Sequence, residues 1–299
     1  MNLNIVDKKN FFFAFSGLII LLSLVSLFVF GLKPGIDFAG GTQWQIKINS
    51  PNINTDTIKD FLSSKLNVKN FVVYPALENN SFLIKLESIS EADHQTYLNA
   101  FKNNFGNVEE LSFESIGPVM GKEVSQRAIR AIILVLLGIG FYIIYAFRKT
   151  SYLVPSYKYG LVVLACLLHD IIIPLGFLVW LGRFKGVDFG VNFVVALLTI
   201  MGYSVHDTIV VFDRIRSNLL VARGKIDFPK MVNDSINQVM ARSINTSLTT
   251  LFVLLTLFFI GPFSLKYFSL VLIIGIIFGT YSSIFIAAPL LVLWQKKSK

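Results

Sequence analysis

The sequence predicts a polytopic α-helical membrane protein with six transmembrane helices and an α+β domain between the first two. Two observations support this fold class. The chain of 299 residues is 54% hydrophobic and only 15% charged, whereas soluble domains carry about 25% charged residues. Its apolar residues form six blocks that approach or exceed the roughly 20 residues needed to cross a bilayer. These blocks lie at residues 11–32, 128–147, 159–181, 189–212, 243–261 and 267–294.

The basic residues predict how the six helices are oriented. Lys and Arg collect in four segments that six crossings would place on one side of the membrane. These are Lys8 and Lys9; Arg148, Lys149 and Lys158; the segment 214–242; and Lys296, Lys297 and Lys299. Cytoplasmic loops carry such an excess, so we expect both termini in the cytoplasm. The net charge of +9 is then a topological signal rather than a sign of nucleic-acid binding.

This topology divides the chain into three parts. Residues 1–32 would hold the cytoplasmic N-terminus and the first helix, and residues 33–127 an extracytoplasmic domain. Residues 128–299 would form the membrane core, with a cytoplasmic loop at 213–242. Within that loop, residues 228–243 carry apolar side chains at helical spacing, which predicts a short helix lying on the membrane surface.

The extracytoplasmic segment has the pattern of an α+β domain. Residues 41–48 alternate with a period of two and predict a strand. A helix at 54–66, capped by Asn54 or Thr55, and a second at 90–105, capped by Ser90, follow from apolar periodicity and capping residues. Further strands are expected at 70–77, 81–88 and 107–116. The order βαββαβ is typical of a ferredoxin-like fold, and His94 on the second helix is expected at the surface.

Asp207 is the most informative charged residue, because it lies inside an apolar block. An ionisable group deep in a membrane helix costs about 2.5–3.5 kcal/mol on insertion scales, so it is rarely kept without a function. Tyr203 and Ser204 share its helical face. We therefore favour a proton or ion site at Asp207 over a purely structural role. Asp213 and Arg214, at the cytoplasmic end of the same block, are expected to reach the membrane interface.

Arg242 is the predicted counter-charge for Asp207, since both lie toward the cytoplasmic half of their helices. It opens a polar stripe with Asn245, Thr246, Thr249 and Thr256. An arginine keeps its proton and would hold the carboxylate ionised until Asp207 itself is protonated. The alternative is a static buried ion pair.

His169 and Asp170 place an imidazole and a second acid near the middle of the third block. Pro174 follows four residues later and removes the helical partner of the Asp170 carbonyl. A proton-relay role and a structural role, in which the pair ties helices together by hydrogen bonds, are equally consistent with the sequence.

The last block carries small residues at steps of four, which allow close helix packing. They are Gly275, Gly279, Ser283 and Ala287. The sequence shows no zinc-protease motif, no phosphate-binding glycine loop and no Ser-His-Asp arrangement. We therefore expect neither a metal site nor an enzymatic activity.

Four motifs together resemble the SecF branch of the SecD/SecF family of bacterial protein export. They are GIDFAGGT at 35–42, GPVMGKEV at 117–124, HDIIIPLGF at 169–177 and GYSVHDTIVVFDRIR at 202–216. The matching residues include Gly35, Asp37, Phe38, Gly40, Gly41, Thr42, Asp213 and Arg214. The resemblance extends over nearly the whole chain.

The resemblance implies an RND-type membrane core in the bacterial cytoplasmic membrane, surrounded by lipid and completed by SecD as a heterodimer. It implies a cycle driven by protons, without other cofactors, that draws preproteins outward through the SecYEG channel after the ATPase SecA has pushed them in. YajC is a further candidate partner. By the same resemblance, Asp207 is the essential intramembrane acid and Arg242 its basic partner.

One position departs from the family pattern beside this acid. His206 stands where the family usually has Asn. A histidine could join the proton relay, because its charge changes near physiological pH, or it could be a polar neighbour that faces away.

Two other functions compete with export. An RND-type antiporter subunit for small solutes or drugs is disfavoured, because full exporters of that class usually carry both halves in one chain. An intramembrane hydrolase using His169 and Asp170 is disfavoured by the lack of a nucleophile or metal motif.

Overall fold

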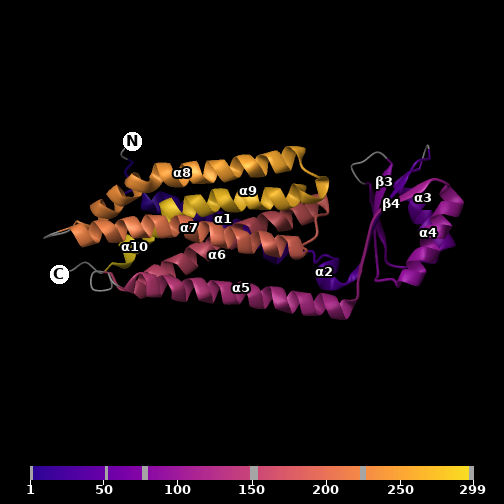
Figure 1. The fold of residues 1–299 in the computed structure, drawn as a ribbon, viewed down its shortest axis with the longest axis horizontal. Helices are drawn as coiled ribbons and strands as arrows, with labels where there is room; N and C mark the ends of the chain where they lie inside the picture. Colours follow the sequence, from indigo (N-terminus) through magenta and orange to yellow (C-terminus); the bar gives the residue numbers. More distant parts are fainter. Residues whose placement is uncertain (1–2, 51–52, 76–79, 149–153, 223–226, 296–299) are drawn as a thin grey trace. The chain divides into compact units, whose positions relative to one another are not determined.

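The computed structural model describes residues 3–50, 53–75, 80–148, 154–222 and 227–295, which belong to two compact units (Figure 1). The first unit comprises Met1–Lys33 and Arg130–Lys299, and the second comprises Pro34–Ile129. Lys149, Lys296, Lys297 and Lys299 of the predicted basic segments lie outside the described residues.

Six helical segments of the described chain are long and apolar enough to cross a membrane, which confirms the predicted number. The first five are α1 (Lys9–Phe30), α5 (Pro118–Ala146), α6 (Ser156–Lys185), α7 (Val191–Val221) and α8 (Phe228–Ile260). The sixth comprises α9 (Phe263–Ser282), one π-helical turn η3 (Ser283–Ala287) and α10 (Ala288–Trp294).

Helices α7 and α8 extend well into the segment predicted as a cytoplasmic loop. The prediction of a separate surface helix at 228–243 is wrong, because these residues form the first half of the continuous α8. Asp227 caps this helix by accepting a hydrogen bond from the Lys230 backbone N–H at 3.3 Å. Val232 and Ile236, two apolar residues of the segment, are fully buried in the core of the first unit.

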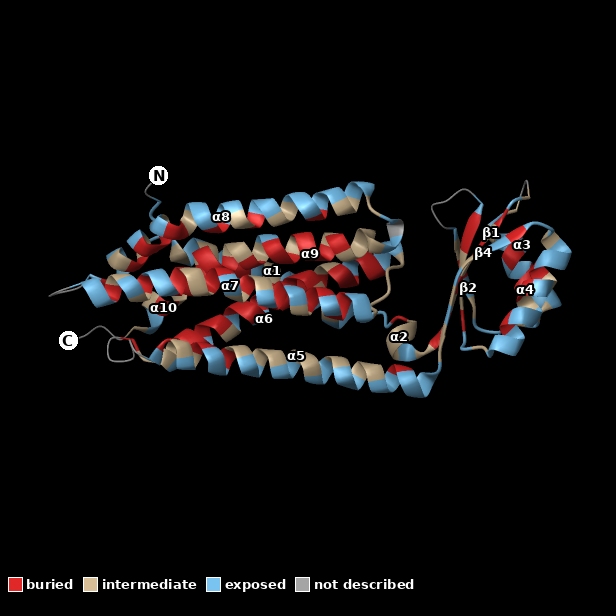
Figure 2. Cartoon of the chain, viewed as in Figure 1, coloured by how far each residue is buried: buried red, intermediate tan, exposed pale blue. Residues whose placement is uncertain are grey.

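Helix α9 lies at the centre of the first unit and packs against α6, α7 and α8, while α1 packs against α6. Figure 2 shows that buried residues gather on α6 and α9, whereas α5 and α8 present mostly exposed faces. Small residues permit these contacts. A Cβ atom at Gly275 would lie 2.2 Å from Ile200 Cδ1, and one at Gly176 would lie 2.5 Å from Ser23 Cα.

The second unit contains a four-stranded antiparallel sheet in the order β2-β3-β1-β4. The strands are β1 (Gly41–Ile48), β2 (Val72–Pro75), β3 (Ser81–Leu86) and β4 (Val108–Ile116). The helices are α2 (Ile36–Ala39), α3 (Thr55–Asp60) with the π-helical turn η1 (Phe61–Lys65), and α4 (Glu91–Phe105). From β1 onward the elements follow the predicted order.

The predicted caps begin α3 and α4. Asn54 accepts a hydrogen bond from the Thr57 backbone N–H at 2.8 Å, and Ser90 accepts one from the Asp93 backbone N–H at 3.2 Å. Both helices contribute to one core with alternate residues of the sheet. Its members include Trp44, Ile46, Ile48, Ile58, Leu62, Ile84, Leu98 and Phe101.

His94 is buried in this core, with 3% of its surface exposed, so the prediction of a surface residue is wrong. Its ring stacks on Phe113 with centroids 3.6 Å apart, and its Nε2 lies 2.7 Å from Glu110 Oε2. The indole of Trp44 donates to the same carboxylate oxygen at 3.1 Å. Because β4 supplies a polar partner, the imidazole can be buried without losing its hydrogen bonding.

Two glycine-containing motifs pack backbone against backbone in the second unit. Gly40 has φ +77°, and a Cβ atom there would lie 2.7 Å from Pro118 Cα. A Cβ atom at Gly121 would lie 2.9 Å from the Gly40 backbone nitrogen. The segment around Gly40 and the start of α5 can therefore approach each other only because neither position carries a side chain.

We predict that Gly40→Ala destabilises the second unit more than Gly106→Ala does. Gly106 also has positive φ, +78°, but no atom lies within 4 Å of its would-be Cβ. Its substitution should cost about 1–3 kcal/mol for the strained positive-φ backbone alone, whereas Gly40→Ala adds a backbone clash. Thermal unfolding of the full chain, followed by Trp44 fluorescence with Trp180 and Trp294 changed to Phe, measures the difference. Equal destabilisation by the two variants would contradict the packing argument.

Candidate proton site in the membrane core

Asp207 lies on the inner face of α7, with only 2% of its surface exposed. Two hydroxyl groups from neighbouring helices donate to its Oδ2 atom. Thr280 of α9 is 3.2 Å away and Ser247 of α8 is 3.4 Å away. The same two hydroxyls are 2.5 Å from each other. Asp207, Ser247 and Thr280 thus form a polar cluster, which we call the Asp207 cluster, where three helices meet.

The Ser247 hydroxyl has a second acceptor inside the cluster's own helix. It lies 2.9 Å from the Ser243 backbone carbonyl, one turn earlier on α8. A hydroxyl has one proton to donate, so Ser247 can direct it to the carboxylate, to the carbonyl or to the Thr280 hydroxyl. The cluster therefore has more than one hydrogen-bonding arrangement available without moving a helix.

Arg242 does not form the predicted ion pair with Asp207 in this structure. Its side chain belongs to the exposed face of α8, and the described residues contain no ion pair at Asp207. The neighbouring Ser243 is buried, as is Ser247. Since successive helical residues are turned by about 100°, the serines face the core and Arg242 faces outward. Asn245, Thr249 and Thr256, predicted on the same stripe, are also exposed.

The remaining polar residues of the fourth span are divided between the two faces of α7. His206 is exposed, although it is adjacent to Asp207 in sequence. Asp213 and Arg214 are exposed near the end of the helix, where Arg214 donates to Gln238 of α8. Ser204 is buried as its spacing predicts, but its hydroxyl donates to Asp170 and not to Asp207.

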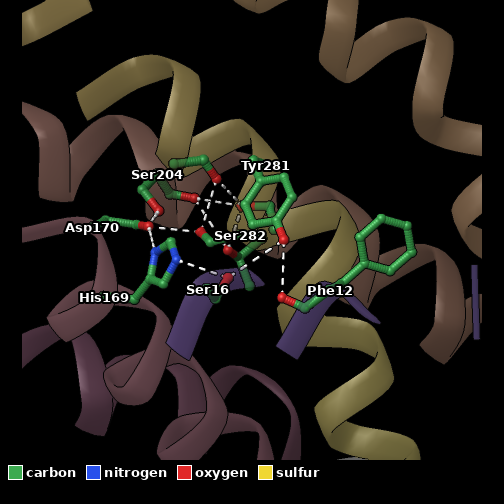
Figure 3. A network of polar contacts seen from close by, with 10 residues as sticks. Phe12, Ser16, His169, Asp170, Ser204, Tyr281 and Ser282 are labelled. Atoms are coloured by element: carbon green, nitrogen blue, oxygen red, sulfur yellow. Dashed lines mark hydrogen bonds and ion pairs between the residues drawn. The ribbon is translucent and has the colours of Figure 1, made fainter. Parts of the chain in front are cut away.

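Asp170 is the second buried acid of the core and is fully enclosed, with 0% of its surface exposed. Its Oδ2 atom accepts hydrogen bonds from Ser204 of α7 and from Ser282 of α9, the latter at 2.8 Å. Its Oδ1 atom lies 2.7 Å from Nδ1 of His169 (Figure 3). The structure therefore joins the predicted pair of His169 and Asp170 to two further helices, whereas it leaves Arg242 and His206 outside both clusters.

Sequence reasoning missed the hydroxyl partners of both acids. Ser247, Thr280 and Ser282 are single hydroxyls in apolar helices, where such residues commonly bond to their own backbone. The one signal visible in the sequence was the pair of adjacent serines, Ser282 and Ser283. In the structure this pair lies where α9 passes into the π-helical turn η3. Such turns occur frequently at functional sites.

The small residues of α9 and of the turn η3 hold the sixth span against α7 beside the two acids. A Cβ atom at Gly279 would lie 3.1 Å from Ser204 Cβ. Ser283 bonds to Thr208 at 2.8 Å and to the Ser204 carbonyl at 3.3 Å. Gly275 meets Ile200 as described above, and Ala287 is fully buried.

The glycine-motif residues predicted at 35–42 belong to the second unit, while both acids belong to the first. Gly35 precedes the short helix α2, which contains Asp37 and Phe38. The Thr42 hydroxyl lies 2.8 Å from that of Ser115 and accepts the Ile89 backbone N–H at 3.2 Å. Gly41 has φ +131° at the start of β1. This motif shapes the entry to the sheet.

The described residues contain no group of three or more His, Cys, Asp or Glu side chains arranged to hold a metal ion. The hydroxyl groups beside the two buried carboxylates stabilise the ionised form by hydrogen bonding, but they supply no positive charge. Binding a proton would neutralise either carboxylate.

Comparison with known proteins shows the family of this chain. The family described as "Protein export membrane protein SecD/SecF, C-terminal" matches residues 96–297, and the "SecD/SecF GG Motif" matches residues 25–51. A protein translocase subunit SecF from Thermobaculum terrenum is 42% identical over 99% of this chain and 95% of its own length. One from Sebaldella termitidis is 36% identical over 100% of this chain and 94% of its own length.

A longer relative and a solved structure show the same similarity. Protein translocase subunit SecDF from Thermus thermophilus is 33% identical over 99% of this chain and 39% of its own length. The crystal structure of SecDF from that organism, described as a translocon-associated membrane protein, matches with a TM-score of 0.84 and 33% identity. That match covers 98% of this chain and 39% of the SecDF chain. The fold of the membrane core, its motifs and these relatives together show that the chain belongs to the SecD/SecF family of protein-export membrane proteins.

Proposed function

We propose that this chain works with SecD to promote the export of preproteins across the bacterial cytoplasmic membrane, using the proton motive force through Asp207. Its place as an accessory subunit of the Sec translocase follows from its family and from relatives named translocase subunits SecF and SecDF. The family is one of translocase subunits and not of known enzymes. The proton coupling is the part that the geometry of the core supports.

The observation that carries the proton coupling is a buried carboxylate without a cation. Asp207 has hydroxyl partners from α8 and α9 and, among the described residues, no ion-pair partner. An ionised carboxylate in a low-dielectric interior is costly unless it is paired. Taking up a proton removes that cost, so the charge state of Asp207 is sensitive to the proton supply on either side.

Protonation of Asp207 would rearrange the contacts between three helices. If the proton binds Oδ2, this atom changes from accepting two hydrogen bonds to donating one. Thr280 and Ser247 can no longer both donate to it, and Ser247 can turn to the Ser243 carbonyl. The contact of α7 with α8 and α9 therefore depends on the proton. One elementary charge crossing 100 mV supplies about 2.3 kcal/mol, enough to shift a balance between such arrangements.

SecD fits the exposed polar face of α8. Arg242, Asn245, Thr249 and Thr256 are exposed on a helix that spans the membrane. The two threonines donate to their own backbone, but the Asn245 amide has no hydrogen-bond partner among the described residues. Lipid cannot satisfy such groups. A polar partner helix can, and the Thermus relative that carries SecD and SecF regions in one chain supports SecD as that partner.

We further propose that the second unit is a ferredoxin-like domain on the outer side of the membrane. Its antiparallel strand order β2-β3-β1-β4, with α3 and α4 contributing to one core, supports this class. The excess of Lys and Arg in the four segments described above supports cytoplasmic termini. In this orientation the domain would meet preproteins that emerge from SecYEG after SecA has pushed them in, with YajC as a further candidate partner.

We predict that Asp207→Asn abolishes proton-dependent export while leaving the complex with SecD assembled. The amide keeps a hydrogen-bond acceptor of nearly the same shape but cannot bind the proton. Secretion of a preprotein in cells, with co-purification of SecD as the assembly control, should show export at the level of cells lacking the chain. Export at the wild-type rate would rule out Asp207 as the coupling site.

The pairing of Arg242 with Asp207 stays a prediction for the complex with SecD. If binding of SecD brings the two groups together, Arg242→Met should slow export, and Asp207→Asn should add no further loss to it. A double-mutant cycle of export rates measures this coupling. Additive losses would mean that Arg242 acts independently of Asp207, for example by contacting SecD.

We predict that a cysteine at position 245 crosslinks to SecD. The chain offers a clean background, because Cys166, its single cysteine, is buried. In membranes, Asn245→Cys should react with cysteines placed along the SecD helices, whereas Leu137→Cys on the exposed face of α5 serves as the matched control. Crosslinking from position 137 but not from position 245 would place SecD on another face.

A further inference from the structure

We propose that Asp170 and His169 form a second proton-binding site in the membrane core, connected to the start of α1 through Ser16 and Tyr281. The proposal extends the proton coupling proposed for Asp207 and rests on it. The Asp170–His169 site differs from the Asp207 cluster in its location, in its hydrogen-bonding partners and in the helices that it links.

The pair has a donor set that Asp207 lacks. Asp170 Oδ1 lies 2.7 Å from Nδ1 of His169, and its other oxygen accepts from Ser204 and Ser282. An imidazole is the side chain whose charge changes most readily near neutral pH. A carboxylate and an imidazole in contact can hold a shared proton on either partner, whereas a hydroxyl beside Asp207 can only donate or accept a hydrogen bond.

His169 continues the hydrogen-bonded chain on its other side (Figure 3). Its Nε2 lies 3.2 Å from Ser16 Oγ on α1. The Ser16 hydroxyl lies 3.4 Å from the Tyr281 hydroxyl, which donates to the Phe12 backbone carbonyl at 3.1 Å. Because each ring nitrogen has its own partner, the imidazole can gain a proton at one nitrogen and release one at the other. The chain passes from α6 through α1 to α9 and reaches the first turn of α1.

The charge balance of the site favours proton binding over a static ion pair. His169 and Asp170 are both buried, and among the described residues no lysine or arginine forms an ion pair with Asp170. With neutral histidine and ionised aspartate the site carries an uncompensated negative charge. One added proton, on either residue, makes it neutral. Among the described residues, the other titratable groups that face the pair are the Cys166 thiol, one turn earlier on α6, and Tyr281.

Helices α7 and α9 contribute residues to both acid sites. Helix α7 carries Ser204 and Asp207, three residues apart, and α9 carries Thr280 and Ser282, two residues apart. The Ser282 hydroxyl also has a second acceptor, the Gly279 carbonyl at 3.0 Å. A change of charge at Asp170 would therefore alter the hydrogen bonds of Ser282, immediately before the π-helical turn η3. Thr280, which donates to Asp207, lies two residues earlier on the same helix.

The experiment follows the proton state of both partners in the full chain, co-purified with SecD and returned to lipid, as pH is varied. Nitrogen NMR of labelled histidine reports His169, which is one of only three histidines in the chain. Infrared spectroscopy reports the carbonyl stretch of a protonated carboxyl group. His169→Gln and Asp170→Asn assign the two signals, and Asp213→Asn is the matched control at an exposed acid.

We expect one of the two signals to gain a proton as pH falls, and to do so in Asp207→Asn as well. Ser16→Ala and Tyr281→Phe should shift the midpoint pH of this signal without removing it. Both changes interrupt the hydrogen-bonded chain to α1 but leave the His169–Asp170 pair intact. A proton state that stays constant over the whole pH range in which the complex is folded would overturn the second site. An unchanged midpoint pH in both Ser16→Ala and Tyr281→Phe would overturn the connection to α1.

These outcomes are distinguishable from failure of the proposed function. Should Asp170→Asn fail to assemble, His169→Gln retains the carboxyl group, and its infrared band should titrate with a shifted midpoint. If the pair titrates but Asp207→Asn exports preproteins normally, the proton coupling through Asp207 fails and the second binding site remains. If Asp207→Asn blocks export but the pair does not titrate, only the second site is lost.

Discussion

The membrane core depends on one constraint: two carboxyl groups are buried in an apolar bundle, and among the described residues no lysine or arginine forms an ion pair with either. Such groups persist only if other helices supply hydrogen bonds, because lipid supplies none. Asp170 therefore bonds to His169 of its own helix and to serines of α7 and α9. Asp207 accepts hydrogen bonds from hydroxyl groups of α8 and α9. The positions of four helices are tied to these two acids.

Helix α9 is the element through which this constraint acts on the packing. It must approach α7 closely enough for Thr280, Ser282 and Ser283 to reach their partners. Gly275 and Gly279 make that approach possible, since a side chain at either would meet Ile200 or Ser204. Interfaces rich in small residues are characteristic of membrane helices, whose association relies on close packing rather than on the hydrophobic effect. The stripe of small residues and the polar clusters are thus two parts of one arrangement.

Much of the fold was predictable because its signals are local. The six spans follow from apolar length, and the order of strands and helices in the second unit follows from periodicity and from caps such as Asn54 and Ser90. The depth of Asp207 was evident from the apolar residues around it.

What the sequence could not supply depends on rotation and packing. Arg242 and Ser243 are adjacent, yet one faces outward and the other inward, so only the packed orientation of α8 shows that the predicted ion pair is not formed within this chain alone. His94 was expected at the surface because its burial depends on Glu110, which a bulge in the distant strand β4 helps to position. The pattern of residues 228–243 predicts a helix on the membrane surface, because an amphipathic stretch has the same pattern whether it faces lipid or the core.

If Asp207 couples export to the proton motive force, its carboxylate must bind and release a proton during each cycle. The most direct measurement is proton uptake into lipid vesicles that contain this chain with SecD, driven by an imposed membrane potential and followed by an internal pH indicator. The account predicts uptake in the wild type and none above the protein-free background in Asp207→Asn. Uptake at equal rates in the two would contradict it.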